Sequence, residues 1–279
     1  MSRCFTVLFL SLLLVACQEY DSGAGKNDGA KMQNSPLRTR PLVIAHRGFS
    51  WSGPENTLAS YRLAMEAGAR LAECDVHLSK DGIPVLIHDD QLSRTTNGKG
   101  IVRDLTVAEL QVFDAGSWKG KEFANERIPT LVDALKLVKG RLRLVVEIKQ
   151  PKMEQEVVNA IREAGVAPGD VMIFSFHRSA VEKIAKIEPG LPTTWLLSYL
   201  PAKKTERAEL LAQVVQIRAS AVGLAKKRVD ADFVQMAHER GLPVYVYTVN
   251  EEEDMRSLAN MGVDGIISDR PDLALKVLK

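Results

Sequence analysis

Two short apolar segments of the chain carry acidic residues near their ends. Glu73 and Asp75 stand two residues apart in Leu71–His77, and Glu147 stands near the end of Leu142–Lys149. Alternate side chains of a strand point to the same face, so Glu73 and Asp75 share a face. Three carboxylates in a poorly hydrated place repel one another, and a bound cation relieves that repulsion. Ligands that are all oxygen atoms favour Mg²⁺ or Ca²⁺ over zinc.

An interpretation without a metal is also open. The cations Lys149, Arg47 and Arg70 would then neutralise the three carboxylates. The histidines His46 and His88, at the ends of two further apolar segments, favour the metal site. A pair of imidazoles beside a divalent cation provides the proton transfers that hydrolysis of a stable ester requires.

These residues belong to a regular alternation of strand-like and helix-like segments that begins near Pro41. The apolar runs are Leu42–His46, Leu71–His77, Val85–His88, Leu142–Lys149, Val171–Phe176, Thr193–Leu197, Ala221–Leu224, Val244–Val249 and Gly265–Ser268. The helical patterns are Leu58–Ala67, Met153–Ala164, Ala180–Ile187, Ala208–Ile217, Asp230–Arg240 and Glu252–Met261. Such an alternation predicts a parallel α/β fold.

One connection is too short to contain a helix. Only seven residues separate His77 from Val85, and they include the turn signal Asp81-Gly82. Val85–His88 is therefore expected to be the second arm of a β-hairpin. The other eight runs then form a (β/α)8 TIM barrel. The same reversal of the chain brings His88 back toward the acidic pair.

The expected barrel has polar residues at the C-terminal ends of its strands, where this architecture places its chemistry. By the alternation of faces, the acidic pair and His77 point into the barrel, as do Glu147 and Lys149. The longest departure from the alternation, at about 89–130, is expected to be a small inserted subdomain beside the barrel mouth. Cys74 points outward by the same alternation and is expected to be a small core residue.

The first 17 residues differ from the rest of the chain. Arg3 is followed by the 11-residue apolar run Phe5–Val15, too short for a membrane span of about 20 residues, which indicates a signal peptide over residues 1–16. Leu14-Val15-Ala16-Cys17 resembles the lipobox of bacterial lipoproteins. That resemblance implies cleavage before Cys17 and lipidation of its thiol. A signal peptide with a chance cysteine is the alternative.

The implied location follows from the residues after the lipobox. Gln18, in place of Asp, implies sorting to the outer membrane, facing the periplasm of a bacterial cell envelope. Residues 17–40 are polar and glycine-rich, which indicates a flexible tether carrying the lipidated cysteine, followed by one domain at 41–279. With 37 Lys and Arg against 35 Asp and Glu, the chain lacks the basic excess of a nucleic-acid-binding protein.

A series of short motifs runs through the domain in a fixed order. They are His46-Arg47-Gly48, Pro54-Glu55-Asn56-Thr57-Leu58, Gly68-Ala69, Glu73-Cys74-Asp75-Val76, Lys80-Asp81-Gly82, Val85-Leu86-Ile87-His88-Asp89, Arg94-Thr95-Thr96, Ile128-Pro129-Thr130-Leu131, Glu147-Ile148-Lys149, Ser175-Phe176, Thr248-Val249-Asn250 and Gly262-Val263-Asp264-Gly265. Together they cover about residues 41–275 and resemble the glycerophosphodiester phosphodiesterase family. Tyr247 and Ser268 depart from that pattern, where the family usually has Trp and Thr.

The resemblance implies metal-dependent hydrolysis of a glycerophosphodiester to glycerol 3-phosphate and an alcohol. It implies that His46 and His88 are the general acid and base, and that Arg47 and Lys149 hold the phosphate. The three carboxylates that would hold one divalent cation, Mg²⁺ or Ca²⁺, are Glu73, Asp75 and Glu147. The insertion corresponds to the family's added subdomain.

Further residues and other functions stay open at this point. Glu55 is expected either to orient Arg47 or a substrate hydroxyl, or to belong to a helix cap, and Phe176 is expected to contact substrate at the barrel mouth. A lysophospholipase D or phosphoinositide-type phosphodiesterase is an alternative, for which an apolar slot beside the insertion is expected. A non-catalytic lipoprotein that captures glycerophosphodiesters is a third, although binding alone has no use for a pair of histidines. The sequence leaves the headgroup, the cation and the oligomeric state open.

Overall fold

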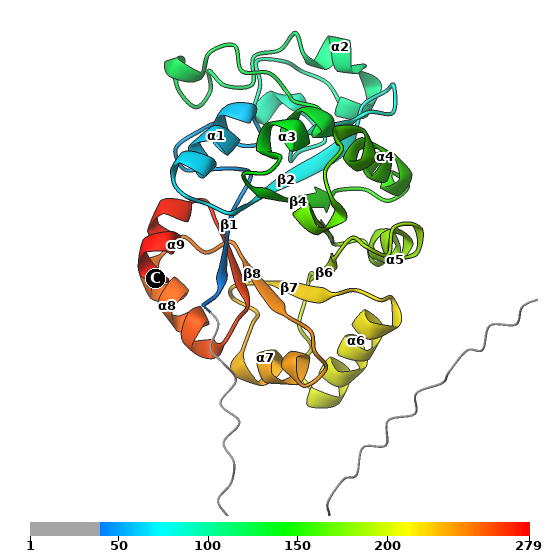
Figure 1. Cartoon of the computed structure of the whole chain (residues 1–279), viewed down its shortest axis with the longest axis vertical. Coiled ribbons are helices and arrows are strands. Elements are labelled where there is room, and N and C mark those ends of the chain that lie inside the picture. The colour runs from blue at the N-terminus through cyan, green and yellow to red at the C-terminus, as the bar shows by residue number, and fades with distance from the viewer. Residues whose placement is uncertain (1–39) are drawn as a thin grey trace, which may run out of the picture. The chain divides into compact units, whose positions relative to one another are not determined.

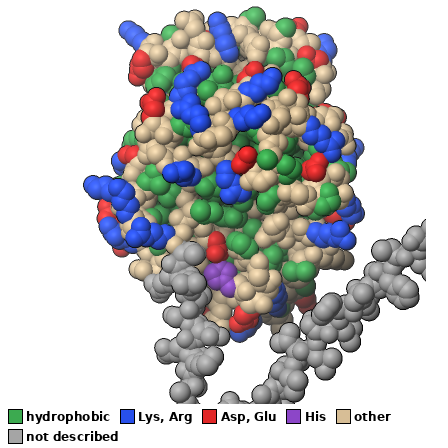
Figure 2. Space-filling view, viewed as in Figure 1, with side chains coloured by type: hydrophobic (Ala, Val, Ile, Leu, Met, Phe, Trp, Pro, Cys, Tyr) green, Lys and Arg blue, Asp and Glu red, His purple; other side chains and the backbone are tan. Residues whose placement is uncertain are grey.

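The computed structural model describes residues 40–279. The expected signal peptide, the lipidation site Cys17 and nearly all of the expected tether lie outside the described residues. Within residues 40–279, no helix has both the length and the apolar character that crossing a membrane requires. On the face drawn in Figure 2, positive, negative and apolar side chains are interspersed.

Eight parallel strands close into a barrel, which confirms the expected TIM-barrel fold. The strands are β1 (Leu42–Ala45), β2 (Leu71–Leu78), β4 (Arg143–Ile148), β5 (Val171–Ser175), β6 (Thr193–Leu197), β7 (Ala221–Ala225), β8 (Val244–Tyr247) and β9 (Gly265–Ser268). Closure comes from β1, which pairs in parallel with both β2 and β9. The ninth strand, β3 (Pro84–Leu86), pairs antiparallel with the end of β2 and forms the expected hairpin.

Helices surround the strands (Figure 1). They are α1 (Leu58–Glu66), α3 (Leu131–Val138), α4 (Glu154–Ala164), α5 (Arg178–Ile187), α6 (Lys204–Gln216), α7 (Ala231–His238), α8 (Glu252–Met261) and α9 (Pro271–Val277). The sequence patterns did not predict α3 or α9. Both helices are short, with eight residues in α3 and seven in α9, so each shows only about two turns of helical period. A capping box between Thr130 and Asp133 defines the start of α3.

The alternation of faces along β2 and β4 is as predicted. Leu71 and Val145 pack inside the barrel, whereas Ala72, Cys74 and Val146 pack under the helices. The apolar layer inside the barrel therefore lies below the acidic residues that follow on the same faces. This close-packed layer supports the charged side chains from below and excludes water from that side of them.

The insertion between β3 and α3 has its own small apolar core, which includes Leu92, Leu110 and Ile128. It contains the short helix α2 (Val107–Leu110) and a 3₁₀ turn at Leu92–Arg94. Its core also includes Val85 of β3. The hairpin arm thus joins the insertion to the barrel mouth, next to the strand that carries two of the acids.

Candidate active site

The three acids meet at the C-terminal ends of β2 and β4. Asp75 and Glu147 are paired in register across the two strands, and Glu73 lies two residues earlier on the same face. One carboxylate oxygen of each residue lies within 4.8 Å of the others. Glu73 and Asp75 are only 3% and 1% exposed, so water solvates them poorly.

Asp75 is held by two cations and an amide. Its carboxylate lies 3.1 Å from Lys149 Nζ and 3.1 Å from Arg47 Nε, and Asn56 Nδ2 donates to it at 2.9 Å. Burial alone would raise the pKa of Asp75, but Lys149 and Arg47 outweigh it and hold the pKa well below its usual range. Arg70, the third cation considered, is exposed and forms no ion pair with a residue of the described chain.

Glu73 is the least satisfied of the three acids. Its Oε2 accepts a hydrogen bond from the backbone N of Arg47 at 2.9 Å, but its buried Oε1 has no partner within residues 40–279. Burial and the charges of Asp75 and Glu147 raise its pKa well above the usual value. The pKa of Glu147 is raised for similar reasons, although Lys149 Nζ lies 2.8 Å from its Oε1. Buried carboxylate oxygens normally have a hydrogen-bond partner, so the unpartnered Oε1 of Glu73 is available to coordinate a cation.

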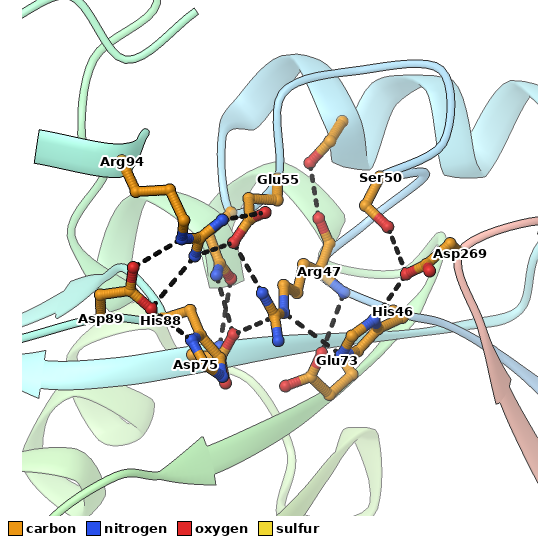
Figure 3. Close-up of polar contacts among 12 residues, drawn as sticks. His46, Arg47, Ser50, Glu55, Glu73, Asp75, His88, Asp89, Arg94 and Asp269 are labelled. Atoms are coloured by element: carbon orange, nitrogen blue, oxygen red, sulfur yellow. Dashed lines mark hydrogen bonds and ion pairs between the residues drawn. The ribbon is translucent and has the colours of Figure 1, made fainter. Parts of the chain in front are cut away.

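His46 follows β1 and is held by a carboxylate from the last strand's end. Its Nδ1 lies 2.6 Å from Asp269 Oδ1, which also accepts from Ser50 Oγ (Figure 3). Asn250 Nδ2 donates to the other carboxylate oxygen, Oδ2. A carboxylate only accepts, so Nδ1 carries the proton. The other ring nitrogen, Nε2, accepts from Arg47 Nε at 3.2 Å and faces the site.

His88 reaches the site along the hairpin arm. The backbone N of Ile87 donates to Asp75 O, which fixes the arm against β2. His88 Nδ1 lies 2.7 Å from Asp89 Oδ1, so this imidazole too is held by a carboxylate. Burial lowers the pKa of His88, and the charge of Asp75 is the largest effect that opposes it. The imidazole therefore lies close enough to the acid cluster for the charge of Asp75 to act on it.

Glu55 bridges two arginines. Its Oε1 lies 2.7 Å from Arg47 Nη1, and Arg94 donates to both of its oxygens. Of the roles expected for Glu55, the structure therefore shows contact with Arg47. The cap of α1 is made instead by Thr57, whose hydroxyl accepts from Ser60 N.

Phe176 lies apart from the charged cluster, on the rim after β5. Its ring packs edge-on against Tyr247 of β8, with ring centroids 5.9 Å apart, and it is 38% exposed. Burial raises the pKa of Tyr247, and the charge of Glu147 adds to the rise. This aromatic pair therefore forms an apolar wall on the Glu147 side of the mouth.

The other histidines have supporting positions. His77 Nε2 lies 3.1 Å from the backbone oxygen of His88, and His177 Nε2 lies 3.1 Å from that of Lys149. Since a carbonyl only accepts, each ring donates and steadies the backbone of a site residue. His238 lies on the outer surface, at the end of α7.

Asp89 and Arg94 were assigned no role from the sequence, and Asn56 and Asp269 were not among the site residues that it predicted. The available signal was the dipeptide His88-Asp89, in which a carboxylate directly follows a candidate proton carrier. The contact between His46 and Asp269 had no local signal, because 223 residues separate them.

The loop that carries Arg47 has an unusual backbone. Arg47 and Gly48 both have positive φ, 54° and 81°. A Cβ at Gly48 would lie 2.3 Å from Ser60 Oγ, the hydroxyl that donates to Arg47 O. Only glycine fits here, so the loop can turn tightly and direct the Arg47 side chain into the site.

Comparisons with known proteins agree with one another. The model of the Glycerophosphoryl diester phosphodiesterase family matches residues 46–273. The chain is 34% identical over 259 residues to a glycerophosphodiester phosphodiesterase of Bacillus subtilis, covering 86% of this chain and 87% of that protein. It is 35% identical to one of Caldanaerobacter subterraneus subsp. tengcongensis, covering 86% of this chain and 98% of that protein.

A solved structure shares the architecture. A phosphodiesterase of Oleispira antarctica, in complex with the product sn-glycerol-3-phosphate, superposes with a TM-score of 0.76 at 34% identity. The superposition covers 85% of this chain and 96% of that one.

Proposed function

The chain belongs to the glycerophosphoryl diester phosphodiesterase family and is an enzyme of that kind, and we propose that it works by metal-dependent catalysis with His46 and His88 as acid and base. One observation carries this proposal. Two imidazoles at the mouth are each bound at Nδ1 by a carboxylate, at 2.6 and 2.7 Å, which makes Nε2 the nitrogen proposed to exchange protons with the substrate. In this structure Nε2 of His46 accepts from Arg47 Nε, a contact that the substrate would replace. A non-catalytic binding protein is not supported, because the relatives named above are enzymes.

The proton transfers follow from these tautomers. A neutral imidazole whose Nδ1 donates to a carboxylate has its lone pair on Nε2, where it takes a proton from the attacking hydroxyl. The second imidazole, protonated at both nitrogens, delivers its Nε2 proton to the departing alkoxide. In each pair the carboxylate stabilises the charged ring and holds its orientation. The attacking hydroxyl belongs to water or to the glycerol group of the substrate.

Arg47 and Lys149 are proposed to bind the phosphate. Both now lie 3.1 Å from Asp75 at the mouth, where their charges reach a bound anion. Phe176 and Tyr247 are proposed to pack against the carbon atoms of the substrate. Glu55 holds the Arg47 guanidinium from the opposite side.

The carboxylate cluster fits a divalent cation. Lys149 contacts Asp75 and Glu147, and Arg47 is shared between Asp75 and Glu55, whereas the buried Oε1 of Glu73 has no partner within residues 40–279. A divalent cation would offset the repulsion among the three carboxylates and would attract the negative charge of a phosphodiester. Glu73, Asp75 and Glu147 would hold the ion, which is Mg²⁺ or Ca²⁺ in view of the all-oxygen ligands. When bound, it would offset the charge that develops on the phosphate oxygens.

The substrate is proposed to be a water-soluble glycerophosphodiester. The Oleispira relative holds sn-glycerol-3-phosphate, the product of such a reaction. The cavity between the insertion and His88 has a volume of about 10 Å³, which is room for one water molecule rather than an acyl chain. A groove of about 320 Å³ lies on another side of the mouth, between Phe176 and α6.

The purified protein is expected to turn over glycerophosphocholine at least about tenfold faster than lysophosphatidylcholine, because the cavity that lies between His88 and the insertion is too small for an acyl chain. Release of glycerol 3-phosphate from the first substrate and of choline from the second measures this. Equal or faster turnover of lysophosphatidylcholine would support the lysophospholipase D alternative and assign the acyl chain to the groove beside Phe176. No release from either substrate would contradict the proposed activity.

We also propose that Cys17 carries a lipid and anchors the enzyme to the bacterial envelope, facing the periplasm from the outer membrane. The support is the sequence Leu14-Val15-Ala16-Cys17 with Gln18. Metabolic labelling with palmitate is expected to mark the full-length protein in a bacterial host and to fail with Cys17→Ser. Cys74→Ser, which changes a cysteine buried under the helices, is the matched control and should keep the label. Label that survives in Cys17→Ser would remove the anchor.

A further inference from the structure

Arg94 is an insertion residue whose guanidinium lies between two carboxylates. It ends the 3₁₀ turn at Leu92–Arg94. Its Nε lies 2.5 Å from Asp89 Oδ2, and its Nη2 lies 3.2 Å from Asp89 Oδ1. On the other side, Nη1 and Nη2 donate to the two oxygens of Glu55 at 2.9 and 2.8 Å (Figure 3). All three guanidinium nitrogens are therefore engaged, in two bidentate contacts.

Each of these carboxylates also contacts a residue of the proposed machinery. Asp89 Oδ1 lies 2.7 Å from His88 Nδ1, and Glu55 Oε1 lies 2.7 Å from Arg47 Nη1. A continuous chain of contacts thus runs from His88 to Arg47, with Arg94 at its centre. Arg94, a residue of the insertion, therefore contacts both Asp89, which holds the His88 imidazole, and Glu55, which holds the Arg47 guanidinium.

The energetics favour a geometric role over a stabilising one. Arg94 is 44% exposed, and exposed ion pairs contribute little to folding stability. Hydrogen bonds from Arg94 are the largest cause that lowers the pKa of Asp89, to about 2. For Glu55, burial would raise the pKa, and the hydrogen bonds from Arg94 are the largest opposing effect. Both carboxylates ionise readily at neutral pH in any case, so what Arg94 adds is a fixed position for each.

We propose that Arg94 is a positioning residue of the active site, holding the His88 imidazole through Asp89 and the Arg47 guanidinium through Glu55. The insertion is then part of the catalytic apparatus. Without Arg94, each carboxylate loses one of its two fixed neighbours and is free to rotate. The Nε2 of His88 and the phosphate-binding nitrogens of Arg47 then lose their shared alignment. This proposal rests on the proposed roles of His88 and Arg47.

The test replaces Arg94 in the full-length enzyme and measures kcat and KM with glycerophosphocholine. Arg94→Ala is expected to lower kcat by about 10- to 100-fold with a smaller change in KM and an unchanged melting temperature, because misalignment affects the transition state most. Arg94→Lys should recover little, since one ammonium group cannot make two bidentate contacts. Added ethylguanidinium should partly restore Arg94→Ala, whereas ethylammonium should not.

Double variants separate positioning from a general structural effect. Asp89→Asn and Glu55→Gln should each lower kcat, and adding Arg94→Ala to either should cost much less than Arg94→Ala alone. Arg103→Ala, at an exposed arginine of the same insertion, is the matched control and should keep wild-type kinetics.

Two results would overturn the proposal in different ways. If Arg94→Ala stays within twofold of wild type, or its effect multiplies fully with those of Asp89→Asn and Glu55→Gln, Arg94 does not position these residues. If His88→Ala keeps full turnover, the proposed catalytic role fails and the positioning role fails with it. Loss of turnover in His88→Ala with a normal Arg94→Ala therefore rejects only the inference about Arg94.

Discussion

His46→Ala and His88→Ala are each expected to lower turnover of glycerophosphocholine by about 10²-fold or more while leaving the barrel folded. Each change removes the group that carries a proton to or from the reacting phosphate ester. Both side chains are partly exposed, 17% for His46 and 33% for His88, so little packing is lost. Steady-state kinetics measure the effect, and thermal melting followed by circular dichroism checks the fold.

His238→Ala is the matched control for both variants. His238 also pairs with a carboxylate, Asp264, at 2.8 Å, but it lies on the outer surface. Its replacement removes the same chemical group and the same kind of contact, away from the site, and should leave kcat unchanged. Full activity of either His46→Ala or His88→Ala would exclude that residue from the proton transfers.

Removing divalent cations with EDTA is expected to abolish turnover, and Mg²⁺ or Ca²⁺ is expected to restore it. Without the ion, the three carboxylates repel one another, and the buried Oε1 of Glu73 has no partner within residues 40–279. The ion would also no longer offset the negative charge that develops on the phosphate oxygens during the reaction. Activity in chelator, followed by titration with each metal, measures both steps. Undiminished turnover in chelator would favour the interpretation in which Arg47 and Lys149 neutralise the acids.

Thermal melting gives a readout of the same site that does not depend on activity. A cation that binds the folded state raises the melting temperature of the wild type. Glu73→Gln should abolish this metal-dependent rise. Glu154→Gln changes another buried glutamate, at the start of α4 and outside the carboxylate cluster, and should keep the rise. An equal rise in the wild type and Glu73→Gln would place the ion elsewhere.

The direction of the pKa shift predicts how Glu73→Gln behaves without metal. Burial and two neighbouring acids raise the pKa of Glu73 in the folded state. Its ionisation therefore costs stability, and this cost is absent below the unfolded pKa and grows as the pH rises toward the folded one. At neutral pH in chelator, Glu73→Gln should consequently be at least as stable as the wild type.

The carboxylates that hold the two histidines come from distant parts of the chain. Asp269 follows the last strand and holds His46 after the first, whereas Asp89 follows the hairpin and holds His88. The first contact exists because β1 pairs with β9 and closes the barrel. The second depends on the insertion through Arg94. Closure of the barrel thus positions His46, and docking of the insertion positions His88, in the proposed acid–base pair.

The sequence by itself determined the strands, the hairpin and the faces of β2 and β4, because these depend on local alternation and on one short turn. That alternation alone predicts that Glu73, Asp75 and Glu147 point into the same barrel lumen. Helix α3 was not predicted, because its eight residues show only about two turns of helical period.

Only the tertiary structure decided which residues hold the candidate catalytic groups. The contacts of Asp269 with His46 and of Arg94 with Glu55 join residues 223 and 39 positions apart. Such contacts depend on the paths of loops and on side-chain rotamers, and neither of these produces a repeating pattern in the sequence. The unpartnered Oε1 of Glu73 is likewise a property of the packed site, since it depends on every neighbour that the fold brings near.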